Sequence, residues 1–194
     1  MKKLFTLVLV FAMALSMAAC DTAKPNETTT TPVETTTEPA PVVASALEIL
    51  ETVWAQFGDN EKFPVMGGDY EAMVDSAPGA VKDTGFMNGT LLVPEAELTN
   101  VSEAASLVHG MMLNNFTCGA FKVADAAAFA EAMHGAISTN PWMCGMPEKM
   151  VIATIGGEYV VALFGVNDAV NPFEAKLTAA YPAAEIVYSE AITG

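Results

Sequence analysis

Two stretches of the sequence decide the fold: residues 115–133 read NFTCGAFKVADAAAFAEAM, and residues 151–165 read VIATIGGEYVVALFG. The first stretch opens with apolar and β-favouring residues over Phe116 to Val123, which predict a strand. Asp125 follows as a helix N-cap, and apolar residues then recur at helical spacing over 126–138. This stretch therefore predicts a strand that leads directly into a helix.

The second stretch and the residues after it continue the alternation. Residues 150–155 and 159–164 predict two strands, and Gly156-Gly157 predicts the tight turn that joins them. Asn171-Pro172-Phe173-Glu174 predicts a helix start, with Asn as N-cap, Pro at the first helical position and Glu at the third. A last strand is predicted over Glu185 to Ser189.

From Phe116 onward the predicted order is strand, helix, strand, strand, helix, strand, which is the ferredoxin-like split βαβ pattern. A right-handed crossover would make strands 116–123 and 150–155 parallel, with strand 159–164 between them. We expect both helices to cover one face of the sheet. The predicted fold class is thus α+β: an N-terminal helix followed by a ferredoxin-like βαββαβ sandwich with an antiparallel or mixed sheet.

The N-terminal helix of this prediction starts at a capping box. Ser45 is its N-cap and Glu48 its third helical residue, apolar residues follow at helical spacing as far as Phe57, and Gly58 ends it.

Residues 101–113 admit two interpretations. Asn100 to Glu103 could form a capping box, which favours a helix. Leu107 to Leu113 before Asn114-Asn115 could instead be the first arm of a hairpin, because Asn tolerates the positive φ of tight turns. We predict a helical start that runs into a strand.

Residues 1–19 have the pattern of a signal peptide. Lys2 and Lys3 precede an uncharged apolar run, Leu4 to Leu15, which is shorter than the roughly 20 residues that span a bilayer. Ala18-Ala19-Cys20 resembles the lipobox of bacterial lipoprotein precursors, although Met17 stands where that motif usually has Leu. The resemblance implies cleavage before Cys20 and attachment of lipid to its thiol. The alternative is a plain secreted protein.

Residues 20–43 form a Thr-, Pro- and Glu-rich segment without aromatic residues. Such a composition cannot bury enough apolar surface to fold, so we predict a disordered tether. Residues 44–194 have the length of one α+β domain with a substantial core.

The charge of the processed chain limits its partners. Removal of residues 1–19 leaves six lysines, 23 acidic residues and no arginine, a net charge of −17. Nucleic-acid affinity rests on cationic contacts to phosphates, so we expect no nucleic-acid binding. Anionic lipid headgroups are equally poor partners. The predicted link to the membrane is the lipid alone, on the extracytoplasmic face of the cell membrane.

The stretch from Asn115 to Met133, the hairpin with Gly157-Glu158-Tyr159-Val160 and the capped helix after it resemble an uncharacterised domain family of small clostridial-type bacterial lipoproteins. Those proteins also carry a lipobox, a polar tether and an early helix. The resemblance covers roughly residues 46–190 and implies architecture and location only.

Cys118 and Cys144 are the cysteines that remain once Cys20 is lipidated. An even pair in an exported domain favours a disulfide. The proposed fold puts both near the starts of parallel strands, at one end of the sheet. The alternative is two buried free thiols.

Several methionines lie beside histidine or cysteine, and the resulting metal-ligand candidates are His109, Met111, Met112, His134 and Cys144. Thioether and thiolate groups suit Cu(I). The alternative is that methionine fills the core of an Ala-rich domain. Trp142 and Met143 in their Pro- and Gly-flanked loop form either an exposed contact patch or part of the core.

The sequence carries no known nucleophile, metalloprotease, phosphate-loop or dinucleotide motif, so we nominate no catalytic residue and no cofactor. We expect a lipid-anchored extracytoplasmic lipoprotein whose domain binds a partner or contributes to envelope structure. The alternative is an envelope enzyme or a metal-handling protein.

Overall fold

The computed structural model describes residues 43–193. The signal peptide, Cys20 and all but the last residue of the predicted tether lie outside the described residues. Within residues 43–193, no helix is both long enough and apolar enough to cross a membrane.

The described residues form α-helices, short 3-10 helices and strands. The helical elements are α1 (Ala46–Trp54), α2 (Thr84–Gly89), η1 (Glu95–Asn100), η2 (Leu113–Asn115), α3 (Ala126–Thr139) and α4 (Asn167–Ala180). The strands are β1 (Val65–Gly67), β2 (Val74–Asp75), β3 (Gly79–Val81), β4 (Val101–His109), β5 (Phe116–Val123), β6 (Lys149–Ile155), β7 (Tyr159–Gly165) and β8 (Glu185–Ala191).

The local signals for three of these elements are confirmed. The side chain of Ser45 accepts a hydrogen bond from the N–H of Glu48 (3.1 Å) at the start of α1. Asp125 accepts from the N–H of Ala128 (3.0 Å) at the start of α3. Gly156 and Gly157 have φ of 61° and 77° in the three-residue turn between β6 and β7, a backbone conformation that glycine adopts without strain.

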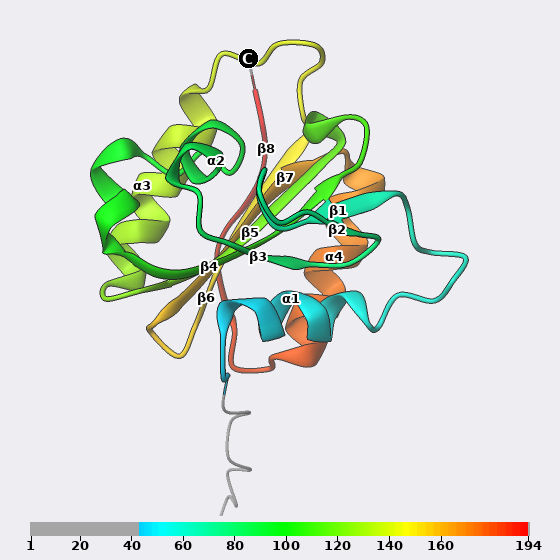
Figure 1. Cartoon of the computed structure of the whole chain (residues 1–194), viewed down its shortest axis with the longest axis horizontal. Helices are drawn as coiled ribbons and strands as arrows, with labels where there is room; N and C mark the ends of the chain where they lie inside the picture. Colours follow the sequence, from blue (N-terminus) through cyan, green and yellow to red (C-terminus); the bar gives the residue numbers. More distant parts are fainter. Residues whose placement is uncertain (1–42, 194) are drawn as a thin grey trace, which may run out of the picture. The chain divides into compact units, whose positions relative to one another are not determined.

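The strands form one eight-stranded sheet in the order β2-β1-β4-β5-β7-β6-β8, and β3 pairs with β4 beside β1 (Figure 1). Every pair of neighbouring strands in it is antiparallel. β7 lies between β5 and β6, so these two strands run parallel to each other. The α+β class and the predicted arrangement of these three strands are confirmed.

The predicted placement of both helices on one face is wrong. α3 and α2 cover one face of the sheet, and α1 and α4 cover the other (Figure 1). Successive side chains of a strand point to opposite faces, and β7 is buried along its whole length. Each face of the sheet therefore carries an apolar row that needs its own helical cover.

The last strand also departs from ferredoxin-like order, in which it would lie beside the first strand of the unit. Here β8 pairs with β6 at one edge of the sheet, and β4 occupies the place beside β5. The result is an antiparallel sheet between two helical layers.

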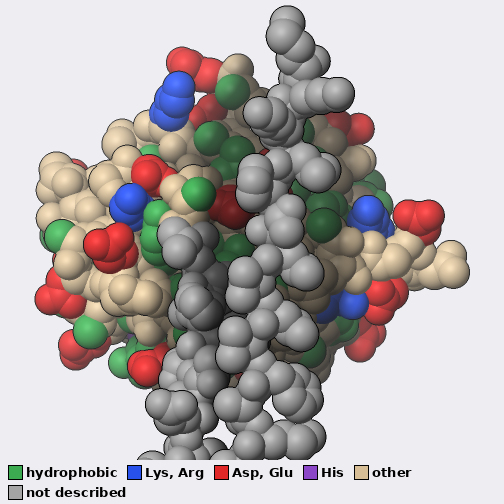
Figure 2. Space-filling view, turned by 90° about the horizontal axis from the view of Figure 1, so that it is seen from below, with side chains coloured by type: hydrophobic (Ala, Val, Ile, Leu, Met, Phe, Trp, Pro, Cys, Tyr) green, Lys and Arg blue, Asp and Glu red, His purple; other side chains and the backbone are tan. Residues whose placement is uncertain are grey.

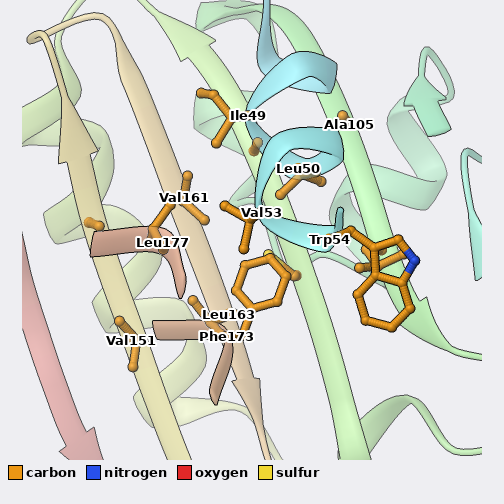
Figure 3. Packing of buried hydrophobic residues seen from close by; sticks show 14 of the residues in the cluster. Ile49, Leu50, Val53, Trp54, Ala105, Val151, Val161, Leu163, Phe173 and Leu177 are labelled. Carbon is orange, nitrogen blue, oxygen red and sulfur yellow. The ribbon is translucent and has the colours of Figure 1, made fainter. Parts of the chain in front are cut away.

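The core between α1, α4 and the sheet is the larger of the two clusters of buried residues. Leu50 and Val53 of α1 meet Phe173 of α4 above Val161 and Leu163 of β7 (Figure 3). Burying such side chains contributes roughly 1.5–3 kcal/mol each. This cluster therefore fixes α1 and α4 to the central strands.

Residues 101–109 are strand throughout, so the helical start predicted there is wrong. β4 pairs with β5 on one side and with β1 and β3 on the other. These ladders satisfy backbone groups that a helix would have to satisfy internally. Asn100 ends the short helix η1 and caps no helix after it.

α4 begins at Asn167, four residues before the predicted cap at Asn171. The backbone N–H of Asn167 donates to the carboxylate of Glu148 (2.8 Å), a cap from a distant part of the chain. Pro172 lies inside the helix, where its missing N–H removes only the bond to the carbonyl of Asp168.

Candidate binding surface at one end of the sheet

Apolar side chains that the fold leaves exposed gather at one end of the sheet. We call Tyr70, Met73, Met111, Met112, Leu113 and Met143 the methionine surface, because each is exposed and each lines one of two neighbouring cavities. Met111 and Met143 are 83% and 77% exposed. Leu113 lines both cavities, which joins the residues into one surface.

Three loops build this surface. The first joins β4 to β5, and the second joins α3 to β6. Both lie at the end of the sheet where β5 and β6 begin (Figure 1). The third follows β1 and carries Tyr70 and Met73. Loops at the end of a rigid sheet are a common location for binding residues.

The loop between α3 and β6 is held from both sides. The ring of Trp142 packs against Phe164, with ring centroids 5.0 Å apart. The side-chain amide of Asn114 donates to the carbonyls of Met143 and Gly145 (2.8 Å and 2.5 Å). The sequence left open whether Trp142 and Met143 form an exposed patch or part of the core. The structure divides them, because Trp142 packs against the core and Met143 is exposed.

His109 fixes the loop between β4 and β5. Its Nδ1 accepts hydrogen bonds from the backbone N–H groups of Met111 and Met112 (both 3.2 Å). Its ring stacks on Phe63, with centroids 6.1 Å apart and planes 13° apart. At the far side of the loop, the hydroxyl of Thr117 donates to the carbonyl of Leu113 (3.0 Å). The methionine side chains therefore project from an ordered backbone.

The first cavity is apolar. It measures about 130 Å³ and is lined by Met66, Gly67, Gly68, Tyr70, Met73, Phe86, Thr90, Val108 and Leu113. Tyr70 stands edge-on to Phe86, with ring centroids 5.0 Å apart. Gly67 is needed at its base, because a Cβ there would lie 2.2 Å from the backbone nitrogen of Gly79.

The loop that carries Tyr70 and Met73 is organised by a buried carboxylate. Asp69 is 3% exposed, and its oxygens accept four backbone N–H groups: those of Glu71 and Ala72 (both 3.2 Å), Lys82 (2.6 Å) and Asp83 (3.0 Å). These donors, the N–H of Lys82 first, hold the pKa of Asp69 below its ordinary value. Asp69 is therefore a structural group that links the loop after β1 to the residues between β3 and α2.

The domain surface is acidic, and several lysines are already paired. Lys122, Lys149 and Lys176 contact the carboxylates of Glu103, Glu174 and Glu61 at 3.5, 2.6 and 3.2 Å. Acidic side chains are spread around the face seen in Figure 2. Glu71 is exposed on the loop that carries Tyr70 and Met73, and Asp75 is exposed on β2. An acidic domain of this kind favours cationic partners.

The two cysteines of the described range are both free, and the structure does not join them. Cys118 is fully buried in β5, on the face covered by α1 and α4, and burial raises the pKa of its thiol. Cys144 is exposed in the loop between α3 and β6. The predicted disulfide is absent because the two side chains belong to different environments, one in the core and one at the surface.

The structure divides the metal-ligand candidates into two groups. Met111, Met112 and Cys144 line the second cavity, which measures about 250 Å³, together with Leu113, Asn114 and Met143. His109 faces the backbone of its own loop. His134 on α3 bonds to Glu190 on β8 (2.8 Å) and stacks on Tyr188, so it belongs to another contact. Among residues 43–193 no three His, Cys, Asp or Glu side chains are grouped to hold a metal.

A wider hollow, about 770 Å³, lies at the opposite end of the sheet, beside the turn between β6 and β7. Ala and Gly provide most of its lining. Its acidic members are Asp125, which caps α3, and Glu185 at the start of β8. This lining offers no nucleophile paired with a base.

Sequence reasoning identified Met111, Met112, Met143 and Cys144 but missed Tyr70, Met73 and Leu113. It also missed Asn114, which connects the two loops. The chain matches no protein-family model, no curated protein and no solved structure. The resemblance to clostridial-type lipoproteins therefore stays a prediction.

Proposed function

We propose that the chain is a lipid-anchored extracytoplasmic binding protein, whose domain takes up an apolar and positively charged segment of a partner protein on the methionine surface. The observation that carries the proposal is the exposure of Tyr70, Met73 and Leu113 around an apolar cavity, next to a second cavity that the exposed Met111 and Met143 line. Exposed apolar patches of this kind are typical of interaction sites.

Methionine suits such a surface for physical reasons. Its unbranched, polarizable side chain adapts to partners of different shape, and it is enriched on surfaces that bind apolar peptides. The backbone beneath it is fixed by His109 and Asn114, so binding would order side chains without ordering loops. That lowers the entropy cost of association.

The cavity and the charge define the occupant. An apolar cavity of about 150 Å³ can hold a benzene molecule, so the cavity of 130 Å³ accommodates one side chain of similar size, such as leucine or phenylalanine. The acidic surface of the domain, with Glu71 exposed on the same loop as Tyr70 and Met73, favours lysine or arginine on the same segment. A basic segment with apolar anchors fits both features.

The anchor part of the proposal rests on the sequence. A short uncharged apolar run before Ala18-Ala19-Cys20 supports export and lipidation. Two acyl chains hold a protein firmly to a bilayer without further contacts. The domain would then search for its partner at the membrane surface, at the end of the segment over residues 20–43.

The test uses two apolar side chains of equal exposure, since Leu113 and Val187 are both 44% exposed. Leu113→Asp puts a charge between the two cavities, and Val187→Asp puts the same charge on β8 as a matched control. The probe is a short synthetic peptide of leucine, phenylalanine and lysine, and its comparison peptide has glutamate in place of each lysine.

Fluorescence anisotropy of the labelled peptide measures binding to the purified chain. We expect the lysine peptide to bind, the glutamate peptide not to bind, and Leu113→Asp to weaken binding by about tenfold or more, as loss of an interface anchor does. Val187→Asp should bind like the unaltered chain. Equal binding by both variants, or equal binding of both peptides, would refute the proposed surface.

A further inference from the structure

The second cavity of the methionine surface is lined mostly by sulfur-containing residues. Of the six residues that line it, Met111, Met112, Met143 and Cys144 each present a thioether or a thiol, and the other two are Leu113 and Asn114. These side chains come from two loops that are about thirty residues apart in the sequence. We propose that Met111, Met112, Met143 and Cys144 form a binding site for the monovalent soft cation Cu(I).

Both loops are held in place before any ligand arrives. Cys144 is one of three non-glycine residues with positive φ in the described range (63°), a backbone conformation that an ordinary side chain rarely adopts. The carbonyls on either side of it, those of Met143 and Gly145, accept from the amide of Asn114 in the other loop. These two hydrogen bonds of Asn114 therefore connect the loop that carries Met143 and Cys144 to the loop that carries Met111 and Met112.

The donor set selects the metal. Thiolate and thioether ligands favour Cu(I). Calcium and magnesium require oxygen ligands, and no carboxylate lines this cavity. Structural zinc sites take four ligands from cysteine and histidine, whereas this cavity offers one cysteine and no histidine. A ligand set of three thioethers and one thiolate thus suits Cu(I) better than it suits calcium, magnesium or zinc.

The binding step is a simple exchange at Cys144. The thiol releases its proton to water, a Cys144 Sγ–Cu(I) bond forms, and the copper keeps its oxidation state. The neutral thioethers of Met111, Met112 and Met143 complete the coordination. The thiolate and the cation cancel each other's charge, so the occupied site is neutral at the centre of an apolar surface.

This inference goes beyond the proposed peptide binding and can be tested apart from it. The metal would occupy the sulfur-lined cavity, whereas the peptide's apolar side chain would occupy the cavity beneath Tyr70 and Met73. Met73 provides the matched control, because it is an exposed methionine (61%) that lines the other cavity.

The experiment is an anaerobic titration of the purified chain carrying Cys20→Ala, so that residue 20 cannot bind the metal. Cu(I) is supplied as its bicinchoninate complex, and transfer to the protein is followed by loss of that complex's colour. We expect one Cu(I) per chain and a copper X-ray absorption spectrum with sulfur ligands alone.

In the same background, Cys144→Ser and the triple variant Met111→Leu/Met112→Leu/Met143→Leu should each bind Cu(I) at least about tenfold more weakly, since both remove ligands directly and even an outer-shell change costs this much. Met73→Leu should bind like the Cys20→Ala chain. Failure of that chain to compete with bicinchoninate would overturn the proposal. Full affinity in the triple variant would also overturn it, because the thiol would then be acting without the thioethers.

Discussion

Replacement of Asp69 by Asn should destabilise the domain more than any other change of one carboxylate to an amide. The side chain is 3% exposed and accepts four backbone N–H groups from two separate segments, residues 71–72 and residues 82–83. Asparagine keeps one of the two acceptor oxygens and has an NH₂ group in place of the second. The N–H groups that donated to the second oxygen then face this NH₂ group. Two N–H groups, either those of Lys82 and Asp83 or those of Glu71 and Ala72, then lose their acceptor.

The magnitude follows from those two groups. A buried N–H left without a partner costs roughly 1–3 kcal/mol, so two of them cost about 2–6 kcal/mol. Water will reach part of a loop at the sheet edge and reduce the upper value. We expect a loss of about 3 kcal/mol in the free energy of unfolding at neutral pH.

The stability lost on replacing Asp69 by Asn should depend on pH, and the direction of that dependence follows from the pKa of Asp69. Backbone N–H donors lower the pKa of Asp69 in the folded state. A lowered folded pKa stabilises the protein above the unfolded value of about 4, and this stabilisation is lost as pH falls through the folded value. Asparagine does not titrate. The difference in stability between the unaltered chain and Asp69→Asn should therefore be full at neutral pH and shrink below about pH 4.

Urea denaturation followed by tryptophan fluorescence measures both quantities. Asp75→Asn is the matched control, because Asp75 is exposed on β2 in the same segment, and it should change stability by less than about 0.5 kcal/mol. A cost for Asp69→Asn no greater than that of the control, or a cost that grows in acid, would show that the four hydrogen bonds do not organise the loop.

Three further predictions concern the core, the thiols and the anchor. Phe173→Ala removes a fully buried ring between α4, α1 and the sheet and should lower the free energy of unfolding by about 3–5 kcal/mol in the same assay, whereas a loss below about 1 kcal/mol would contradict the packing. A thiol reagent should modify Cys144 in the native protein and Cys118 only after unfolding, because Cys118 is buried with a raised pKa; failure of both cysteines to react in the unfolded, unreduced protein would instead indicate a disulfide. A clickable palmitate analogue should label the unaltered chain in cells and not Cys20→Ala, and label that persists in the variant would refute lipidation at Cys20.

Elements with strong local signals could be predicted from the sequence. Ser45 and Asp125 cap the helices that follow them, and Gly156-Gly157 provides the turn of the hairpin. In each case the residues that decide the structure lie within a few positions of one another, so no distant contact is needed.

The faces of the sheet could not be assigned in the same way. Which face α4 covers, and which strand β8 pairs with, depend on contacts between residues far apart in the chain. One local signal does indicate two covered faces: Tyr159 to Phe164 is apolar without alternation, as expected for a strand that is buried on both sides. The cap of α4 also comes from a distant residue, Glu148, which explains why its start was predicted too late.

The site was predicted in part for a similar reason. The residue types of Met111, Met112 and Cys144 suggested soft ligands, but sequence alone does not distinguish exposed methionine from core methionine. The structure exposes these side chains on loops whose backbone is held by His109 and Asn114. His134 looked equivalent by sequence, yet its ring is engaged by Glu190 and Tyr188 on β8.

The central claim is that the methionine surface is where this domain binds its partner, and methyl-labelled methionine tests it most directly. NMR spectra of the chain with ¹³C-methyl methionine would be recorded while the peptide of leucine, phenylalanine and lysine is added. The account predicts that the methyl signals of Met73, Met111, Met112 and Met143 shift with the peptide, and that those of the buried Met133 and Met150 stay in place. Shifts confined to other methionines, or none at saturating peptide, would contradict it.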